Sequence, residues 1–180
     1  MLSTFIVRCR GLSLKYDIAT ECTNGNTQER ATLIGYAVMI LLQSKKYSLF
    51  QVLTIRCWIE QAIELGQIKF FFDWDGTPIG YITWAYLAED VESRLMGDNN
   101  FLLHFSEWNE GGNLWVIDFC MPTGNVKEAV RYFLEEIRLS YGGRLSWVRR
   151  HANYSVRKVC RYEIGSGIFL SKTLSHSQKG

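Results

Sequence analysis

The chain has 180 residues, of which 47% are hydrophobic and 14% aromatic, and its formal net charge is +2. These values predict one folded domain with a full core and exclude an intrinsically disordered chain. The small net charge and the absence of a recognised nucleic-acid motif argue against nucleic acid as a partner. Five cysteines without CxxC spacing favour free thiols in a reducing cytoplasm, so we expect neither a disulfide framework nor a metal site.

Residues 1–30 are polar in part and give no clear pattern, although they contain no apolar run typical of a secretory signal. The longest apolar run, residues 34–42, is too short to span a bilayer, so we expect no stable membrane insertion. A short buried helix is predicted at 33–42, and residues 44–47 interrupt it. A longer helix is predicted at 49–65, and Gly66 is expected to end it.

A β-hairpin follows, with strands at 68–73 and 79–87 joined by an Asp75-Gly76 turn. The pattern then predicts a short helix at 89–96 and a possible strand at 101–105. Further strands are predicted at 114–121, 144–150 and 154–164, with a helix from Val126 to about Ile137 and a loose tail at 171–180. We therefore predict an α/β (α+β) single domain with a central mixed, mostly antiparallel sheet flanked by helices.

The strand at 114–121 contains a single carboxylate, Asp118, among apolar residues. Burying an unpaired carboxylate costs on the order of several kcal/mol or more. Asp118 must therefore be paired, hydrogen-bonded, protonated or directed into a cleft. Pro122 ends the strand and Gly124 permits a sharp turn before the helix. Such a turn can leave a slot in which backbone N–H groups meet a thioester or phosphate, which makes Thr123 and Gly124 candidates for contacting an acyl donor.

Three segments carry a family resemblance: AIELGQ at 62–67, PIGYITWAYL at 78–87 and GGNLWVIDFCMPTGN at 111–125. Their order and separation resemble the toxin-activating lysine acyltransferases, which fatty-acylate internal lysines of RTX toxins. The family shows a P-V-A-Y-x-S-W-A-like strand and a W-x-I-D-W-x-A-P-like strand, and the convincing match covers roughly residues 34–140.

This resemblance implies a GNAT-like fold, a cytoplasmic homodimer, acyl-acyl carrier protein as acyl donor and a lysine of a toxin or bacteriocin-like protein as acceptor. The family's essential Asp falls on Asp118. The family's catalytic His precedes the long helix, and this chain has Tyr47 at that position. Tyr47 is therefore a candidate for an oxyanion or acid element.

Lysine acylation needs a group that takes a proton from the attacking amine, whose ordinary pKa is about 10.4. Asp118 could orient a base, act as the base or hold the lysine, and a structural carboxylate is the alternative. His104, in an apolar stretch, could replace the missing base, although such a histidine more often belongs to a packed core.

The last predicted strands contain a run of basic residues that could form one positive face for an acidic carrier protein: Arg144, Arg149, Arg150, Arg157, Lys158 and Arg161. Arg149 and Arg150 are the candidates for donor binding, and solvated strand charges are the alternative. The expected function is protein lysine acylation from acyl-acyl carrier protein. A non-catalytic module that binds a carrier protein or a protoxin on the same fold is the alternative.

Overall fold

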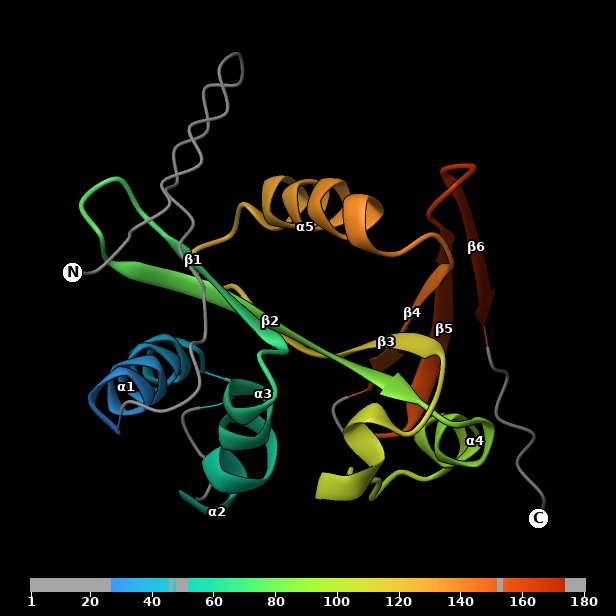
Figure 1. Cartoon of the computed structure of the whole chain (residues 1–180), viewed down its shortest axis with the longest axis horizontal. Helices are drawn as coiled ribbons and strands as arrows, with labels where there is room; N and C mark the ends of the chain where they lie inside the picture. Colours follow the sequence, from blue (N-terminus) through green and yellow to red (C-terminus); the bar gives the residue numbers. More distant parts are fainter. Residues whose placement is uncertain (1–26, 46, 48–51, 152–153, 174–180) are drawn as a thin grey trace. The chain divides into compact units, whose positions relative to one another are not determined.

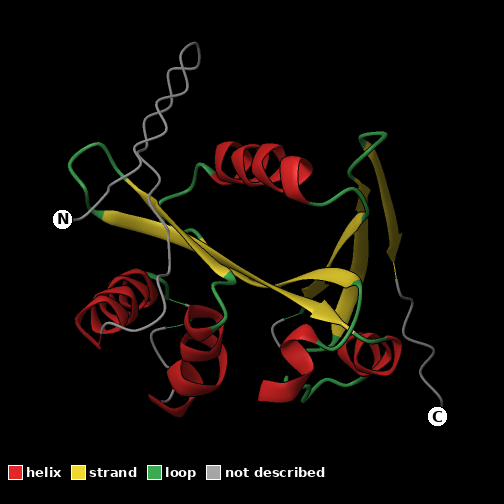
Figure 2. Ribbon diagram, viewed as in Figure 1, coloured by secondary structure: helices red, strands yellow, loops and turns green. Residues whose placement is uncertain are grey.

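The computed structural model describes residues 27–45, 47, 52–151 and 154–173. Figures 1 and 2 show the described helices and strands. In chain order the helices and strands are α1 Thr27–Gln43, α2 Val52–Thr54, η1 Ile55–Glu60, α3 Gln61–Glu64, β1 Ile68–Phe72, β2 Pro78–Leu87, α4 Glu89–Gly97, η2 Phe105–Asn109, β3 Asn113–Cys120, α5 Val126–Ser140, β4 Arg144–Arg150, β5 Val156–Glu163 and β6 Ile168–Thr173.

The described strands form a six-stranded sheet in the order β1-β2-β3-β4-β5-β6. The pairs β1–β2, β4–β5 and β5–β6 are antiparallel, whereas β3 and β4 run parallel through two residue pairs, which begin at Leu114 and Leu145. The predicted mixed, mostly antiparallel sheet flanked by helices is thus confirmed. Contacts divide the chain into two compact units, Met1–Thr83 with Asp118–Phe133 and Trp84–Ile117 with Leu134–Gly180, and each is described separately.

In the first unit, β1 is buried along its whole length, which explains why residues 68–72 are nearly all apolar. On one side Tyr36 of α1 presents its ring to the edges of Phe70 and Phe72, with centroids 5.9 and 5.0 Å apart. On the other side the Lys69 ammonium lies 5.3 Å from the ring centre of Tyr132 in α5. The strand therefore forms the centre of this unit's core.

Gly80 in β2 allows this strand to approach β3 closely. A Cβ at this position would lie 2.9 Å from the carbonyl oxygen of Cys120 and closer still to the Met121 side chain. Any larger residue would force the two strands apart. Because Tyr81 and Thr83 follow on the same strand, this contact also fixes their distance from Asp118.

In the second unit, α4 is fastened to the sheet by two polar groups. The indole N–H of Trp115 donates to Glu92 at 2.9 Å. The Arg150 guanidinium donates to the carbonyl oxygens of Leu95 and Asp98 at 2.8 and 3.2 Å, and so satisfies carbonyls at the end of the helix that would otherwise lack partners.

Three sequence predictions need correction. The first helix begins at Thr27, not residue 33, because its polar first turn is stabilised by Glu29 and by ion pairs of Arg30 with Glu60 and Glu64. Residues 101–104 form no strand, and Phe105 begins the 3-10 helix η2. The loose tail was predicted from 171, yet Ile168–Thr173 form β6, so the tail prediction is wrong for residues 171–173.

The long helix predicted at 49–65 is confirmed from Val52 to Glu64, with a π-helical turn, η1, inside it. Its first residues, 49–51, lie outside the described residues, as do the N-terminal predictions for residues 1–26. Gly66 has a φ of +65°, which fits its predicted role at the helix end.

Candidate functional site

Both carboxylate oxygens of Asp118 accept hydrogen bonds from side chains remote in sequence. The Tyr47 hydroxyl donates to Oδ1 at 2.6 Å and the Tyr81 hydroxyl donates to Oδ2 at 2.7 Å. The backbone N–H of Phe119 adds a third donor to Oδ1 at 2.9 Å. The carboxylate is therefore held by three donors, and two of them are phenols.

The backbone of Asp118 is held as firmly as its side chain. Its N–H donates to Thr83 Oγ1 at 3.0 Å, and the Thr83 hydroxyl lies 3.4 Å from the Asp118 carbonyl oxygen. Thr83 and Tyr81 are both buried in β2, two residues apart on the same strand face. One strand thus orients both the main chain and the carboxylate of Asp118.

Asp118 is neither locked into the core nor neutralised by a cation. Its side chain is part-buried, and within the described ranges no lysine or arginine forms an ion pair with it. Each carboxylate oxygen can accept about two hydrogen bonds. Oδ1 has two donors, whereas Oδ2 has only Tyr81 among the described residues. Oδ2 therefore keeps an acceptor position for a further N–H or O–H group.

Burial raises the pKa of the Tyr81 phenol well above its ordinary value, and the negative charge of Asp118 raises it further. Tyr81 therefore remains a neutral donor at physiological pH. It donates a hydrogen bond to Asp118, and it cannot act as a base.

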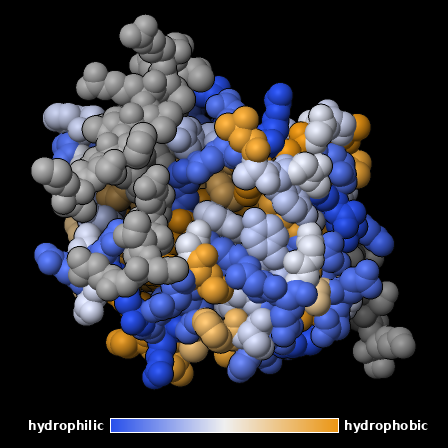
Figure 3. Space-filling view, viewed as in Figure 1, coloured by the Kyte–Doolittle hydropathy of each residue, from blue (hydrophilic) through white to orange (hydrophobic). Residues whose placement is uncertain are grey.

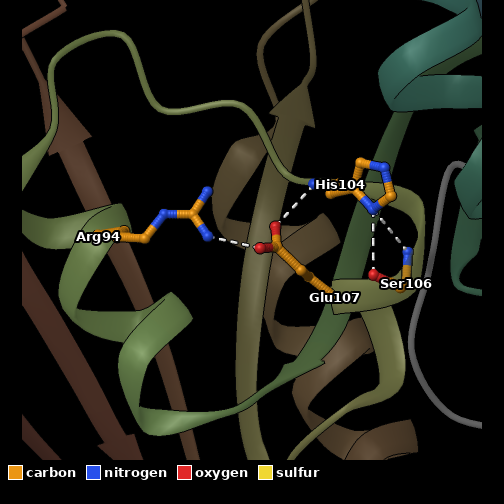
Figure 4. Close-up of polar contacts among 4 residues, drawn as sticks. All are labelled: Arg94, His104, Ser106 and Glu107. Carbon is orange, nitrogen blue, oxygen red and sulfur yellow. Dashed lines mark hydrogen bonds and ion pairs between the residues drawn. The ribbon is translucent and has the colours of Figure 1, made fainter.

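Tyr47 and His104, the two predicted helpers of Asp118, make different local contacts. Tyr47, buried at 8% exposure, meets Asp118 as a hydrogen-bond donor. His104 is exposed and caps η2 instead: its Nδ1 lies 3.0 Å from Ser106 Oγ, while its backbone N–H donates to Glu107, which also pairs with Arg94 (Figure 4). The structure gives His104 a capping role in the second unit, outside the hydrogen bonds of Asp118.

Thr123 and Gly124 form an exposed turn between β3 and α5. The Gly124 N–H donates to the Met121 carbonyl at 3.3 Å, and Gly124 has a φ of +90°, which only glycine adopts readily. The sharp turn is thus present where the sequence predicted it. Contact with an acyl donor at Thr123 or Gly124 remains a prediction.

The basic run does not form one face. In the β4–β5 register Arg149 pairs with Lys158, and Ser146 with Arg161. Because side chains alternate across a sheet, Arg149 and Lys158 lie on one face and Arg161 on the other. Arg150 is half-buried and donates to three carbonyl oxygens, those of Leu95, Asp98 and Tyr154. Donor binding by Arg149 and Arg150 remains a prediction.

Sequence reasoning missed Tyr81 and Thr83, which complete the Asp118 cluster. Both belong to a strand buried on both faces, where a tyrosine and a threonine have the pattern of core residues. Among the described residues, no group of three or more His, Cys, Asp or Glu side chains could hold a metal ion, and no helix is long and apolar enough to cross a membrane.

The sequence comparisons identify the class of protein: the chain is a member of an acyltransferase family. The sequence profile of the RTX toxin acyltransferase family matches residues 26–163, and the chain belongs to this enzyme family. The predicted family is confirmed.

The chain is similar to several individual proteins. An uncharacterized protein of Synechocystis is 29% identical over 113 residues, which cover 62% of this chain and 76% of that protein. The RTX-II toxin-activating lysine-acyltransferase ApxIIC of Actinobacillus pleuropneumoniae is 41% identical over 64 residues, 36% of this chain and 39% of that protein. The leukotoxin-activating lysine-acyltransferase LtxC of Aggregatibacter actinomycetemcomitans is 27% identical over 93 residues, 52% and 54%. The chain spans less than two thirds of both named enzymes.

Among solved structures, a GNAT-family acetyltransferase from Listeria monocytogenes aligns over 76% of this chain and 79% of its own, with 15% identity and a TM-score of 0.46. The family assignment stands on the sequence match and not on this likeness.

Proposed function

We propose that the chain is a protein lysine acyltransferase of the cytoplasm. It transfers a fatty acyl group from acyl-acyl carrier protein to the ε-amino group of an internal lysine in a toxin or bacteriocin-like protein. Family membership supports the reaction class. The observation that carries the site is Asp118, part-buried and oriented by two phenols, with an acceptor position left on Oδ2. The family's homodimer is proposed as its assembly.

The reaction forms a C–N bond and breaks a C–S bond. The lysine first gives up its ammonium proton to solvent, and its neutral nitrogen then attacks the thioester carbonyl carbon. The nitrogen carries an excess proton in the tetrahedral intermediate. Asp118 Oδ2 accepts a hydrogen bond from this nitrogen and so fixes the direction of attack. When the intermediate collapses, the thiolate leaves and takes up the proton released by the nitrogen, so the charges balance. In this scheme, the role of Asp118 is to hold the lysine amine in position.

Tyr47 occupies the position of the family's histidine, but it brings a different chemistry. A phenol with an ordinary pKa near 10 is a poor base at neutral pH, yet it is a good hydrogen-bond donor. Its hydroxyl already donates to Asp118 Oδ1. We therefore assign Tyr47 to holding the carboxylate in place, and the proton transfer does not pass through it.

The decisive measurement is the mass of the acceptor protein after co-expression with this chain and acyl carrier protein. We expect a fatty-acyl mass addition with the native chain. Asp118→Asn keeps the size of the side chain but replaces the acceptor oxygen and the charge, so the addition should fall at least about 100-fold. Arg138→Ala, on an exposed residue of α5, is the control and should leave it unchanged. Equal acylation by Asp118→Asn would refute the assigned role.

Substitutions of Tyr47 test whether its hydroxyl only holds the Asp118 carboxylate in place or takes part in the chemistry. Tyr47→Phe removes the hydroxyl bonded to Oδ1, and we expect transfer to fall by about 10-fold, since Phe119 and Tyr81 still hold the carboxylate. Tyr47→His introduces the family's residue and should support transfer at least as fast as the native chain. A complete loss in Tyr47→Phe would instead show that the phenol takes part in the chemistry.

The replacement of histidine by Tyr47 also favours a second candidate, a non-catalytic module that binds a carrier protein or a protoxin. The same mass measurement distinguishes the two. Binding of the acceptor without any mass addition, in the native chain and in Tyr47→His alike, would support the module and overturn the enzyme.

A further inference from the structure

A shallow apolar groove lies in the second unit, between the last turn of α4 and the strands β5 and β6. Its volume is about 520 Å³, and it is lined by Met96, Val159, Arg161, Leu170, Ser171 and Lys172. We call it the α4–β6 groove. Every residue of β6 is exposed, and Ile168, Phe169 and Leu170 each keep 53–54% of their surface accessible.

The β5–β6 register shows which side chains share the groove face. Val159 pairs with Lys172, Arg161 with Leu170 and Glu163 with Ile168. Directly opposed residues point to the same face of a sheet. The face therefore has an apolar centre, made by Val159, Leu170 and Ile168, with charged side chains beside it.

These charges are predominantly positive. On β5 and β6, Arg157, two residues before Val159 on the same strand face, joins Arg161 and Lys172, and Glu163 adds one carboxylate. The neighbouring helix α4 carries three more carboxylates, of which Glu92 bonds Trp115. The Nε of Arg161 is buried and has no hydrogen-bond partner in the described part of the chain. A buried donor without an acceptor is costly.

An antiparallel sheet usually covers its apolar face with a helix. Here α4 contacts β5, while the β6 side stays open within the described residues. Figure 3 shows hydrophobic side chains at the surface near the start of β6. The missing cover must place apolar side chains over Val159 and Leu170, and carboxylates beside Arg161 and Lys172. A second copy of this face would bring its own cations against these, so charge disfavours it.

We propose that the α4–β6 groove docks an acidic amphipathic helix of the protein that carries the acyl donor. The inference rests on the proposed function, in which the donor is a carrier protein, and it adds the surface that recognises this protein. Arg161 and Lys172 bind its carboxylates, and Leu170 packs against its apolar side chains.

The test measures binding of purified acyl carrier protein to the full chain by isothermal titration calorimetry. Arg161→Glu and Lys172→Glu each reverse a charge at the groove, and we expect the Kd to rise by about 10-fold for each. Leu170→Asp should weaken binding similarly. The matched control Arg138→Glu makes the same charge change on an exposed residue of α5 that does not line the groove, and it should leave the Kd within about 2-fold. Circular dichroism and urea unfolding confirm that each variant is folded.

The outcomes distinguish this proposal from the proposed function. Asp118→Asn should bind the carrier normally and transfer no acyl group. If Arg138→Glu weakens binding as much as Arg161→Glu, or if neither does, the docking surface is wrong, whereas the proposed acyl transfer is unaffected. If Leu170→Asp converts a dimer to a monomer without changing carrier binding, the groove is an interface between copies, and the proposal is overturned.

Discussion

Tyr81→Phe tests the hydrogen bond from Tyr81 to Asp118, a contact that the sequence did not reveal. The substitution removes the hydroxyl that donates to Asp118 Oδ2 at 2.7 Å from a residue with no exposed surface. A hydrogen bond to a charged group contributes about 1.5–3 kcal/mol. Because Asp118 is part-buried and keeps the Tyr47 and Phe119 donors, we expect the lower end, about 1.5 kcal/mol. For a chain of this size the Tm should fall by about 3–6 °C.

The assay is equilibrium urea unfolding of four proteins: the native chain, Tyr81→Phe, Asp118→Asn and the double variant. If the hydroxyl acts through the carboxylate, the double-mutant cycle should give a coupling energy of at least about 1 kcal/mol. Tyr36→Phe is the control, because this ring packs against Phe70 and Phe72 with no hydroxyl hydrogen bond among the described contacts. A coupling energy near zero, or an equal loss in Tyr36→Phe, would refute the reasoning.

Three further predictions follow from the same contacts. Because burial and the charge of Asp118 raise the pKa of Tyr81 above its ordinary 10.0, the unfolded chain loses this proton first as pH rises. The free energy of unfolding should then fall above about pH 10 by up to about 1.4 kcal/mol per pH unit, and urea unfolding of Tyr81→Phe should lack this component. Gly80→Ala should lose about 1–3 kcal/mol in urea unfolding because β3 leaves no room for a methyl group, whereas Gly35→Ala, with open space in α1, should gain about 0.5–1 kcal/mol. Arg150→Ala should lose about 2–3 kcal/mol with its carbonyl bonds, and exposed Arg149→Ala less than about 0.5, both read from thermal unfolding.

Local sequence signals predicted the elements that local chemistry specifies. The Asp75-Gly76 turn forms between β1 and β2, and the Asp75 side chain accepts from the Thr77 N–H at 2.9 Å. The apolar stripe after Gly124 forms α5 from Val126. In both cases the residues that define the element lie within a few positions of one another, so one sequence is sufficient to predict it.

The elements that were missed depend on distant contacts. Phe101 and Leu103 are buried while Leu102 and His104 are exposed, which is the alternation of a strand. The backbone there nevertheless pairs with no neighbouring strand and leads into the cap of η2. Conversely, Ile168–Thr173 is too short and too exposed to show a strand pattern, and only its pairing with β5 makes it β6.

The candidate site also contains residues that the local sequence reveals and residues that only distant contacts reveal. Asp118 could be singled out because a carboxylate is unusual in an apolar strand. Its donors could not be found from spacing, since Tyr81 and Tyr47 lie 37 and 71 residues away. Tyr47 was reached through the family resemblance alone. His104 was selected for its chemistry, whereas the structure gives its ring to a local cap.

The hydrogen bonds that hold Asp118 in place also affect how charged groups approach its carboxylate. A fixed negative charge attracts an approaching ammonium group and repels phosphate at short range. In the proposed reaction, the lysine would therefore approach on the side of the carboxylate, and a donor group that carries negative charge would approach from another side.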